Sequence, residues 1–305
     1  MTEPAVLLPS DPLLARRVDP HFAHEAEAIG AAGGSRVLLD HDALLAGDAE
    51  AAVRRVPAGD GPLWYRGWMI PTAEYAALAA ALASRGRPLL TGPERYAAAH
   101  ELPGWYRTFE PLTPASTWLP GTDWDRAGLA AAAAELGGRG PAVVKDYVKS
   151  RKHEWAEACY LPDLADLDAV ERVVGRFAEL QGSFLAGGLV LRRFESFVRT
   201  ADGHTEEARV WWLDGEPVLV GPHPDCPASR VAPDLSAVGP LVRRLGCRFV
   251  TTDLARRTGA DGPNGPEGPD GAWRVVEVGD GQVSELPSGV DPGPLFRALL
   301  NAWSG

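Results

Sequence analysis

Five basic residues stand close together in a chain that is otherwise acidic. Lys145 lies in the valine-rich stretch PAVVKDYVK, which also ends in Lys149, and Arg151, Lys152 and His153 follow directly. The formal net charge of the chain is -11, so this concentration of positive charge is local. A lysine that points inward from a valine-rich strand is costly unless it meets an anion; a solvated face is the alternative. An inward-facing Lys145 would suit the phosphates of a nucleotide.

Three carboxylates are candidates for holding a divalent cation beside such phosphates. Asp253 follows the apolar stretch RFVTT, Glu277 lies within RVVEVG, and Asp280 comes three residues later. Carboxylates on two neighbouring antiparallel strands can converge on one face, and carboxylate and phosphate oxygens together suit Mg²⁺. Glu277 is the strongest candidate, because a charge among valines needs a partner. The alternative is a structural ion pair between Glu277 and Arg209 or Arg193.

Arginines on predicted strands supply further cations. Glu207 and Arg209 have the same parity, so both leave their strand on one face, where Arg209 could clamp a phosphate through its planar fork. Arg192 and Arg193 point to opposite faces, so at most one of them lines the same pocket, and we favour Arg193. Arg66, in the stretch WYRGWMI, could bind the anionic part of a substrate or form an ion pair or cation-π contact instead.

The N-terminal elements predict a small α/β domain that spans residues 1–115. Strands are expected at 36–40 and 62–70, a helix at 72–84, and a short strand at 87–91. Strands that alternate with helices favour a small parallel sheet.

The second predicted domain spans residues 116–305. The proline-rich segment 101–123 is expected to be an extended connector, and helices are expected at 124–136 and 166–181. Four strand-like segments, the second with a tight Asp-Gly turn, predict an antiparallel sheet: 187–196, 206–220, 248–256 and 272–284. The Gly/Pro-rich run at 259–271 is expected to be the tip of a hairpin.

Composition limits the remaining possibilities. The apolar stretches are broken before the roughly 18 residues that a membrane helix needs, and the N-terminus does not resemble a signal peptide, so we expect a soluble cytoplasmic protein without a membrane partner. The three cysteines are far apart, which predicts buried free thiols rather than disulfides or a zinc site. The acidic balance argues against a nucleic-acid partner. Nothing in the sequence indicates the oligomeric state.

The order of several segments resembles the ATP-grasp superfamily, in the clade named for two arginines and a lysine. These segments are VVKDYVKSRKHEW, LVLRRFE, EEARVWWLDGEPV, FVTTDLAR and VVEVGDGQVSELP. The stretches WYRGWMIP and GPERYAAAHELPGWY also resemble sequences that precede this domain in the clade, so the similarity covers about residues 60 to 290. The resemblance implies an α+β fold: two α+β lobes that grip ATP, preceded by a small α/β N-terminal domain.

The resemblance also implies roles for particular residues. The residue matching Lys145 contacts nucleotide phosphates, and the loop at 150–154 closes over them. The hinge segment that meets the adenine matches Leu191, Arg192, Arg193, Phe194 and Glu195.

The residues matching Asp253 and Glu277 would hold Mg²⁺. Many ATP-grasp enzymes have Glu-x-Asn at this last motif, whereas this chain has Glu277-Val278-Gly279. Gly279 cannot ligate through a side chain, so either Asp280 or Gln282 substitutes for the asparagine or one metal ligand is absent.

The implied activity is an ATP-dependent carboxylate-amine ligase. It forms an amide or peptide bond through an acylphosphate and releases ADP and phosphate from small-molecule or peptide substrates. Lys145, Arg209 and Arg193 would offset charge on the phosphoryl oxygens, with ATP and Mg²⁺ as cofactors. No protein nucleophile is needed, and the sequence has no GxSxG motif. A kinase or phosphotransferase on the same fold and a noncatalytic nucleotide-binding module are the alternatives.

Overall fold

The computed structural model describes residues 5–258, 271–287 and 289–302, and the chain divides into two compact units. Unit 1 comprises Met1–Ala99, Ala208–Asp253 and Val278–Gly305, and unit 2 comprises His100–Glu207 and Leu254–Glu277. Nearly all of the hairpin tip predicted at 259–271 lies outside the described residues. The domain boundary predicted between residues 115 and 116 stays a prediction.

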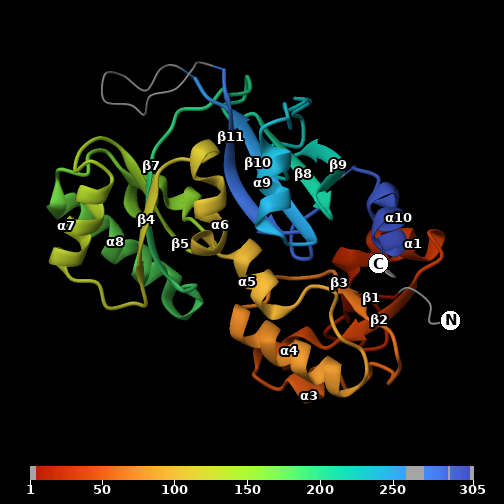
Figure 1. Cartoon of the computed structure of the whole chain (residues 1–305). Helices are drawn as coiled ribbons and strands as arrows, with labels where there is room; N and C mark the ends of the chain where they lie inside the picture. Colours follow the sequence, from red (N-terminus) through yellow and green to blue (C-terminus); the bar gives the residue numbers. More distant parts are fainter. Residues whose placement is uncertain (1–4, 259–270, 288, 303–305) are drawn as a thin grey trace. The chain divides into compact units, whose positions relative to one another are not determined.

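Unit 1 contains a small parallel sheet in the order β2-β1-β3, as predicted (Figure 1, red and orange). Its strands are β1 (Ala5–Pro9), β2 (Ser35–Leu39) and β3 (Leu63–Tyr65). The helices of this region are α1 (Ala23–Ala31), α2 (His41–Leu45), α3 (Ala49–Ala52) and α4 (Thr72–Ser84). Apolar side chains of α4 and of the strands, including Leu78, Leu82, Leu7 and Leu39, form one buried core. A buried core on these strands explains why their apolar runs are nearly continuous.

The structure refines the N-terminal prediction in two places. Helix α4 has the predicted bounds, which confirms that part. The strand predicted at 87–91 is reduced to a single bridge between Leu63 and Leu89, and strand β1 was not predicted at all. Strand β1 is a buried strand of only five residues, which offers no alternation to recognise.

A second sheet has the order β11-β10-β8-β9. Its strands are β8 (Glu207–Leu213), β9 (Glu216–Pro222), β10 (Phe249–Arg256) and β11 (Trp273–Asp280). The division between the two units passes through β10 and β11. Asp214 and Gly215 form the tight turn between β8 and β9 with φ values of 50° and 84°, which confirms the predicted hairpin. Helices α9 (Val238–Leu245) and α10 (Gly293–Asn301) belong to unit 1.

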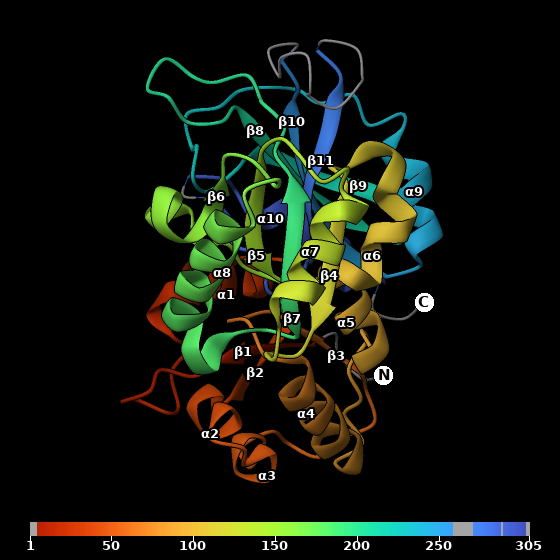
Figure 2. The ribbon, with the colours of Figure 1, turned by 90° about the vertical axis from the view of Figure 1, so that its left-hand side faces the viewer.

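Unit 2 contains an antiparallel sheet in the order β4-β7-β5-β6. Its strands are β4 (Ser116–Pro120), β5 (Ala142–Asp146), β6 (Tyr160–Leu161) and β7 (Gly188–Arg193). Helices α7 (Arg126–Glu135) and α8 (Leu167–Gln181) cover one face of this sheet (Figure 2). Leu129 and Phe177 of these helices pack with Val144 and Leu191 of the strands. One face of β5 and β7 is therefore apolar, and the other is left for polar side chains.

Two predictions about unit 2 were wrong. The segment 101–123, predicted as an extended connector, contains α6 (Leu102–Phe109) and β4, and follows α5 (Pro93–His100). Strand β7 was expected in one antiparallel sheet with the later strands but instead lies between β4 and β5. Sequence order does not specify this pairing, because it joins segments far apart in the chain. Short helical turns are η1 (Pro20–Phe22), η2 (Glu110–Leu112), η3 (Lys152–Glu154), η4 (Trp155–Cys159) and η5 (Gly182–Phe184).

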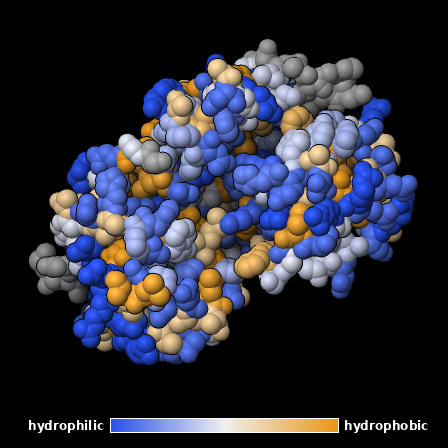
Figure 3. Space-filling model, turned by 180° about the vertical axis from the view of Figure 1, so that it is seen from behind, coloured by the Kyte–Doolittle hydropathy of each residue, from blue (hydrophilic) through white to orange (hydrophobic). Residues whose placement is uncertain are grey.

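The remaining general expectations concern the surface and the cysteines. Among the described residues, no helix is long and apolar enough to cross a membrane. Figure 3 shows a face on which hydrophobic patches are interspersed with hydrophilic surface. Cys159, Cys226 and Cys247 are free and buried, as predicted.

Candidate functional site

Lys145 points into the protein from strand β5. Its residue is 8% exposed, its Nζ donates to the carbonyl oxygen of Val148 at 3.3 Å, and the same nitrogen lies 3.8 Å from Oε1 of Glu277. Burial lowers the pKa of Lys145, and the nearby Glu277 carboxylate opposes this shift. The solvated-face alternative for Lys145 is therefore excluded.

Arg192, rather than Arg193, accompanies Lys145. In the β5–β7 pair Lys145 lies opposite Val190, and Arg192 lies two residues beyond Val190, so Lys145 and Arg192 share one face. The Arg192 Nη2 donates to Thr113 Oγ1 at 2.7 Å and to the Val276 carbonyl at 2.8 Å. Burial lowers the pKa of Arg192 to about 10, and Glu277 is the main opposing charge.

The preference for Arg193 as the pocket residue is corrected by this register. Arg193 leaves β7 on the opposite face, where its guanidinium donates to the carbonyl oxygen of Arg139. Parity along one strand could separate the two arginines, but only the pairing with β5 decides which of them faces Lys145.

Glu277 faces both cations of this cluster from strand β11. Its side chain is 39% exposed and forms an ion pair with Lys145, rather than with Arg209 or Arg193 as in the structural alternative. His100, at the end of α5, is buried close to Glu277, Lys145 and Lys149, and burial lowers the pKa of His100 to about 4. His100 is therefore neutral near pH 7. A helix that opens near Gly92-Pro93-Glu94 is expected from the sequence and agrees with α5, but nothing in the sequence singles out His100 within it.

The basic residues after Lys145 are less buried. Lys149, Lys152 and His153 are exposed, while Arg151 is partly buried and pairs with Glu154 at 3.4 Å. Their role as a cover over phosphates stays a prediction.

The segment predicted to meet the adenine leads out of strand β7. Leu191 is buried in the core, and the Phe194 ring lies 5.3 Å from the Tyr160 ring and 5.9 Å from the Trp155 ring. Glu195 is buried and binds Arg274 through both carboxylate oxygens, at 2.8 and 2.9 Å. Glu195 is thus engaged in a structural ion pair, and the adenine contact stays a prediction for this segment.

A separate polar cluster in unit 1 joins Arg209, Asp253 and His223. Arg209 donates from Nε and Nη2 to the two oxygens of Asp253, at 2.7 and 2.8 Å. His223 Nε2 lies 3.4 Å from Asp253 Oδ2 and 3.0 Å from Arg209 Nη2. Burial raises the pKa of Asp253, but Arg209 and, to a smaller extent, His223 outweigh it and hold the pKa well below its usual range.

Two residues of this cluster were predicted to bind ligands. Arg209 was expected to clamp a phosphate and Asp253 to hold Mg²⁺, but here the two bind each other. His223 was missed, because it follows strand β9 in an irregular loop and has no metal-ligand spacing.

Asp280 and Gln282 lie in a buried network in unit 1. Asp280 Oδ1 accepts from the backbone nitrogen and from Nε2 of Gln282, at 2.9 and 3.0 Å, and the same Nε2 lies 2.9 Å from the Tyr75 hydroxyl. Asp280 Oδ2 is buried and has no hydrogen-bond partner among the described residues. Burial raises the pKa of Asp280 to about 7, with the Gln282 bonds opposing the rise. Gln282 and Oδ1 of Asp280 serve this network, and a metal-binding role for Asp280 stays a prediction.

The side chains around Gly279 explain why a glycine stands at this position of the last motif. A Cβ at Gly279 would lie 2.9 Å from Thr251 Oγ1 and 3.2 Å from Ser284 Oγ, and these two hydroxyls bind each other at 2.6 Å. An asparagine at this position would have to displace them. The described part of the chain contains no group of three or more His, Cys, Asp or Glu side chains that could hold a metal ion. The role of Glu277 in holding Mg²⁺ stays a prediction.

Arg66 has protein partners on several sides. Its Nε and Nη2 bind Glu25 at 2.7 and 2.8 Å, and its Nη1 donates to the Gln282 carbonyl at 3.0 Å. The residue is 1% exposed. This geometry favours the structural ion pair over substrate binding for Arg66.

Comparisons with known proteins agree with this fold. Residues 135–299 match a family of ATP-grasp domains, family 3 of the clade named for two arginines and a lysine. The fold is similar to that of a RimK domain ATP-grasp protein from Sphaerobacter thermophilus, with a TM-score of 0.58, 17% identity, and coverage of 98% of this chain and 100% of that chain. It is also similar to D-cycloserine synthetase DcsG, with a TM-score of 0.62, 16% identity and coverage of 98% of both chains.

A third solved structure is ATP-grasp ligase PsnB complexed with a minimal precursor, Mg and ADP. Its TM-score is 0.53, with 15% identity and coverage of 99% of this chain and 98% of that chain. A comparison with curated proteins found no match. The family match spans more than half of the chain and includes Lys145, Arg192 and Glu277. The chain therefore belongs to this ATP-grasp family and has its α+β fold, as the resemblance of the sequence predicted.

Proposed function

We propose that the chain is an ATP-dependent carboxylate-amine ligase that forms an amide or peptide bond. The observation that carries this proposal is the pair of buried cations, Lys145 and Arg192, on one face of unit 2 beside the partly exposed Glu277. Two cations in a buried position face a desolvation cost that the neighbouring carboxylates offset only in part. Glu277, 3.8 Å from Lys145, is the largest opposing charge for both cations, yet the pKa values of Lys145 and Arg192 stay lowered. In a member of the ATP-grasp superfamily, the polyphosphate of ATP is the natural compensating anion.

Each residue of this cluster has a role that follows from its charge. Lys145 and Arg192 would offset the phosphate charge, and Glu277 would help to hold Mg²⁺ on the phosphate oxygens. His100 is neutral near pH 7, so it adds no charge to the cluster. ATP supplies the phosphoryl group that turns the carboxylate into an acylphosphate for the amine to open, and Mg²⁺ supplies charge compensation.

The similar structures include a D-cycloserine synthetase and a ligase solved with a minimal precursor. Since their identity to this chain is 15 to 16%, they support the fold and only suggest the class of substrate. We infer a carboxylate and an amine that are small molecules or peptides.

The test is product analysis with purified protein, Mg²⁺ and ATP over a panel of amino acids and short peptides. A ligase releases ADP and phosphate only when a carboxylate and an amine are both present, and mass spectrometry finds a new amide. A kinase or phosphotransferase would instead place the phosphate on the acceptor.

Glu277→Gln is the informative variant, because it removes the charge beside Lys145 and keeps the side-chain shape. We expect turnover to fall at least about 100-fold while the melting temperature is retained. Glu179→Gln is the matched control, since Glu179 is an exposed glutamate of α8 that pairs with Arg176. Wild-type turnover by the Glu277 variant would contradict the site assignment.

A noncatalytic nucleotide-binding module is the second candidate, and two observations favour it. Both carboxylate oxygens of Asp253 accept hydrogen bonds from Arg209, and Gly279 has no ligating side chain. Binding of ATP without Mg²⁺-dependent ADP release under any substrate pair would support this candidate and reject the ligase.

A further inference from the structure

Asp146, the last residue of β5, uses both carboxylate oxygens although it is only 1% exposed. Its Oδ1 accepts from the backbone nitrogens of Val148 and Lys149, at 2.7 and 2.5 Å. Its Oδ2 accepts from Gln181 Nε2 at 2.6 Å and from the Ala186 backbone nitrogen at 3.2 Å. All four donors are uncharged, so the carboxylate is held by a fixed arrangement of N–H groups rather than by a cation.

The Oδ1 bonds shape the turn that connects Lys145 with Lys149. Asp146 also donates its own backbone nitrogen to the Lys149 carbonyl at 2.9 Å, and Lys145 forms a bridge with Ser150 across the turn. The Val148 carbonyl in this turn accepts from Lys145 Nζ at 3.3 Å. The carboxylate therefore controls the backbone that holds the ammonium of Lys145 and carries Lys149.

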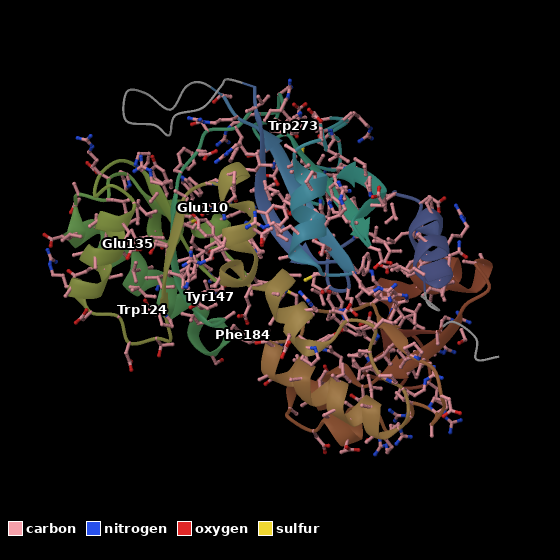
Figure 4. The ribbon with its side chains drawn as sticks, in the orientation of Figure 1. Glu110, Trp124, Glu135, Tyr147, Phe184 and Trp273 are labelled. Carbon is pink, nitrogen blue, oxygen red and sulfur yellow. The ribbon has the colours of Figure 1, made fainter. Side chains whose placement is uncertain are left out.

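The Oδ2 bonds tie this turn to a second segment. Gln181 ends α8 and Ala186 follows it, and the Tyr147 backbone nitrogen donates to the Ala186 carbonyl at 3.2 Å. The Tyr147 ring covers Gly187, which has a φ of +70° and where a Cβ would come within 2.1 Å of the ring. Figure 4 shows Tyr147 and Phe184, a residue of this second segment, at the same edge of unit 2. The turn cannot shift without moving α8 and the segment after it.

Other aspartates in unit 2 form simpler arrangements. Asp163 Oδ1 accepts from the backbone nitrogens of Gly140 and Ala165, at 2.7 and 3.0 Å, in an exposed position. Asp163 thus links its own turn to the loop before β5 through a single oxygen. Asp146 differs because it is buried, uses both oxygens, and stands between two lysines of the candidate site.

We propose that Asp146 is a positioning residue that orders the turn after β5, so that Lys145 and Lys149 are placed to meet the phosphates of ATP. This inference rests on the proposed function. Asp146 contacts no phosphate itself, and its effect is to reduce the reorganisation that nucleotide binding requires.

The test compares Asp146→Asn with Asp163→Asn by calorimetric titration of ATP with Mg²⁺ and, separately, of adenosine. Asparagine keeps one oxygen for the turn but presents an N–H to the Ala186 N–H, so the second half of the arrangement is lost. We expect ATP to bind about tenfold more weakly to the Asp146 variant, with adenosine binding unchanged. The Asp163 variant should bind both ligands as the wild type does.

Each outcome has a definite meaning. Unchanged ATP binding by the Asp146 variant overturns the inference, as does an equal loss for ATP and adenosine, which a purely structural role would produce. If that variant does not fold, Gln181→Leu removes a single donor to Oδ2, and wild-type ATP binding by this second variant also overturns the inference. Failure of the wild-type protein to bind ATP rejects the proposed function itself, and the inference with it.

Discussion

The polar cluster around Asp253 and the one around Lys145 contain the same kinds of side chain but differ in how completely they are paired. In unit 1, Arg209 and Asp253 form two short hydrogen bonds, and His223 lies against both. In unit 2, Lys145 and Arg192 share a buried face, and Glu277 reaches Lys145 only at 3.8 Å.

This difference separates a stabilising role from a binding role. A buried ion pair with good geometry compensates its own desolvation, and breaking it leaves an uncompensated charge. Buried cations whose neighbouring carboxylates compensate them incompletely keep part of their desolvation cost, which an incoming anion can remove. The cluster around Lys145 is therefore the better candidate for ligand binding, and the cluster around Asp253 is the better candidate for stability.

Replacing Lys145 should have the largest effect on activity. Lys145→Met keeps the length of the side chain but removes the ammonium, and we expect turnover to fall by about 100- to 1,000-fold, measured as ADP release. The melting temperature should stay level or rise, because burial already disfavours the charged form of Lys145. Lys149→Met removes an exposed lysine of the same site and should cause a smaller loss of activity. A strong loss of stability in the Lys145 variant would contradict the comparison.

Replacing Asp253 should have the largest effect on stability. Asp253→Asn leaves Arg209 without its carboxylate, and we expect a loss of about 3 kcal/mol in the free energy of unfolding, measured by denaturant titration near pH 7. The folded-state pKa of Asp253 is depressed, so the contribution of this carboxylate is present above its unfolded pKa and is lost as the pH falls. The difference between wild type and variant should thus shrink below about pH 4. Equal stability at pH 7 would be the contrary result.

Replacing each of the two neighbouring arginines of β7 should show which face of the sheet binds ATP. Arg192→Lys cannot reproduce the bonds to Thr113 and the Val276 carbonyl, and we expect ATP affinity to fall about tenfold, roughly 1.4 kcal/mol. Arg193→Lys, on the opposite face, should bind ATP as the wild type does. The same calorimetric titration measures both, and a reversed order would restore the preference for Arg193.

The last prediction, of similar size, is a pH dependence from Asp280. Because its pKa is raised to about 7, the folded state keeps a proton that the unfolded state has already lost, so this group costs stability as the pH rises. Relative to Asp280→Asn, the wild type should lose about 1.4 kcal/mol between pH 6 and pH 8. Taking the difference between the two proteins cancels the contribution of His100, whose lowered pKa acts in the other direction. Parallel stability curves would contradict this assignment.

Local signals predicted the elements that depend on neighbouring residues. Helix α4 and the Asp214–Gly215 hairpin agree with the prediction, because helix propensity and turn chemistry act over a few residues. The helix α6 was missed inside a proline-rich segment, where its Pro103 occupies the first turn and does not interrupt it. Strand β7 was assigned to the wrong sheet, since its partners β4 and β5 are far away in the sequence.

The sequence by itself determined the family, the fold class and the candidate residue Lys145, because the ordered motifs and a lysine among valines are local features. Only the tertiary structure decided that Arg192 shares a face with Lys145, that Arg209 binds the Asp253 carboxylate, and that Asp146 orders the turn after β5. The physical reason is that parity fixes which side chains of one strand share a face. The identity of their neighbours depends on the register between strands and on which charges are left to compensate one another.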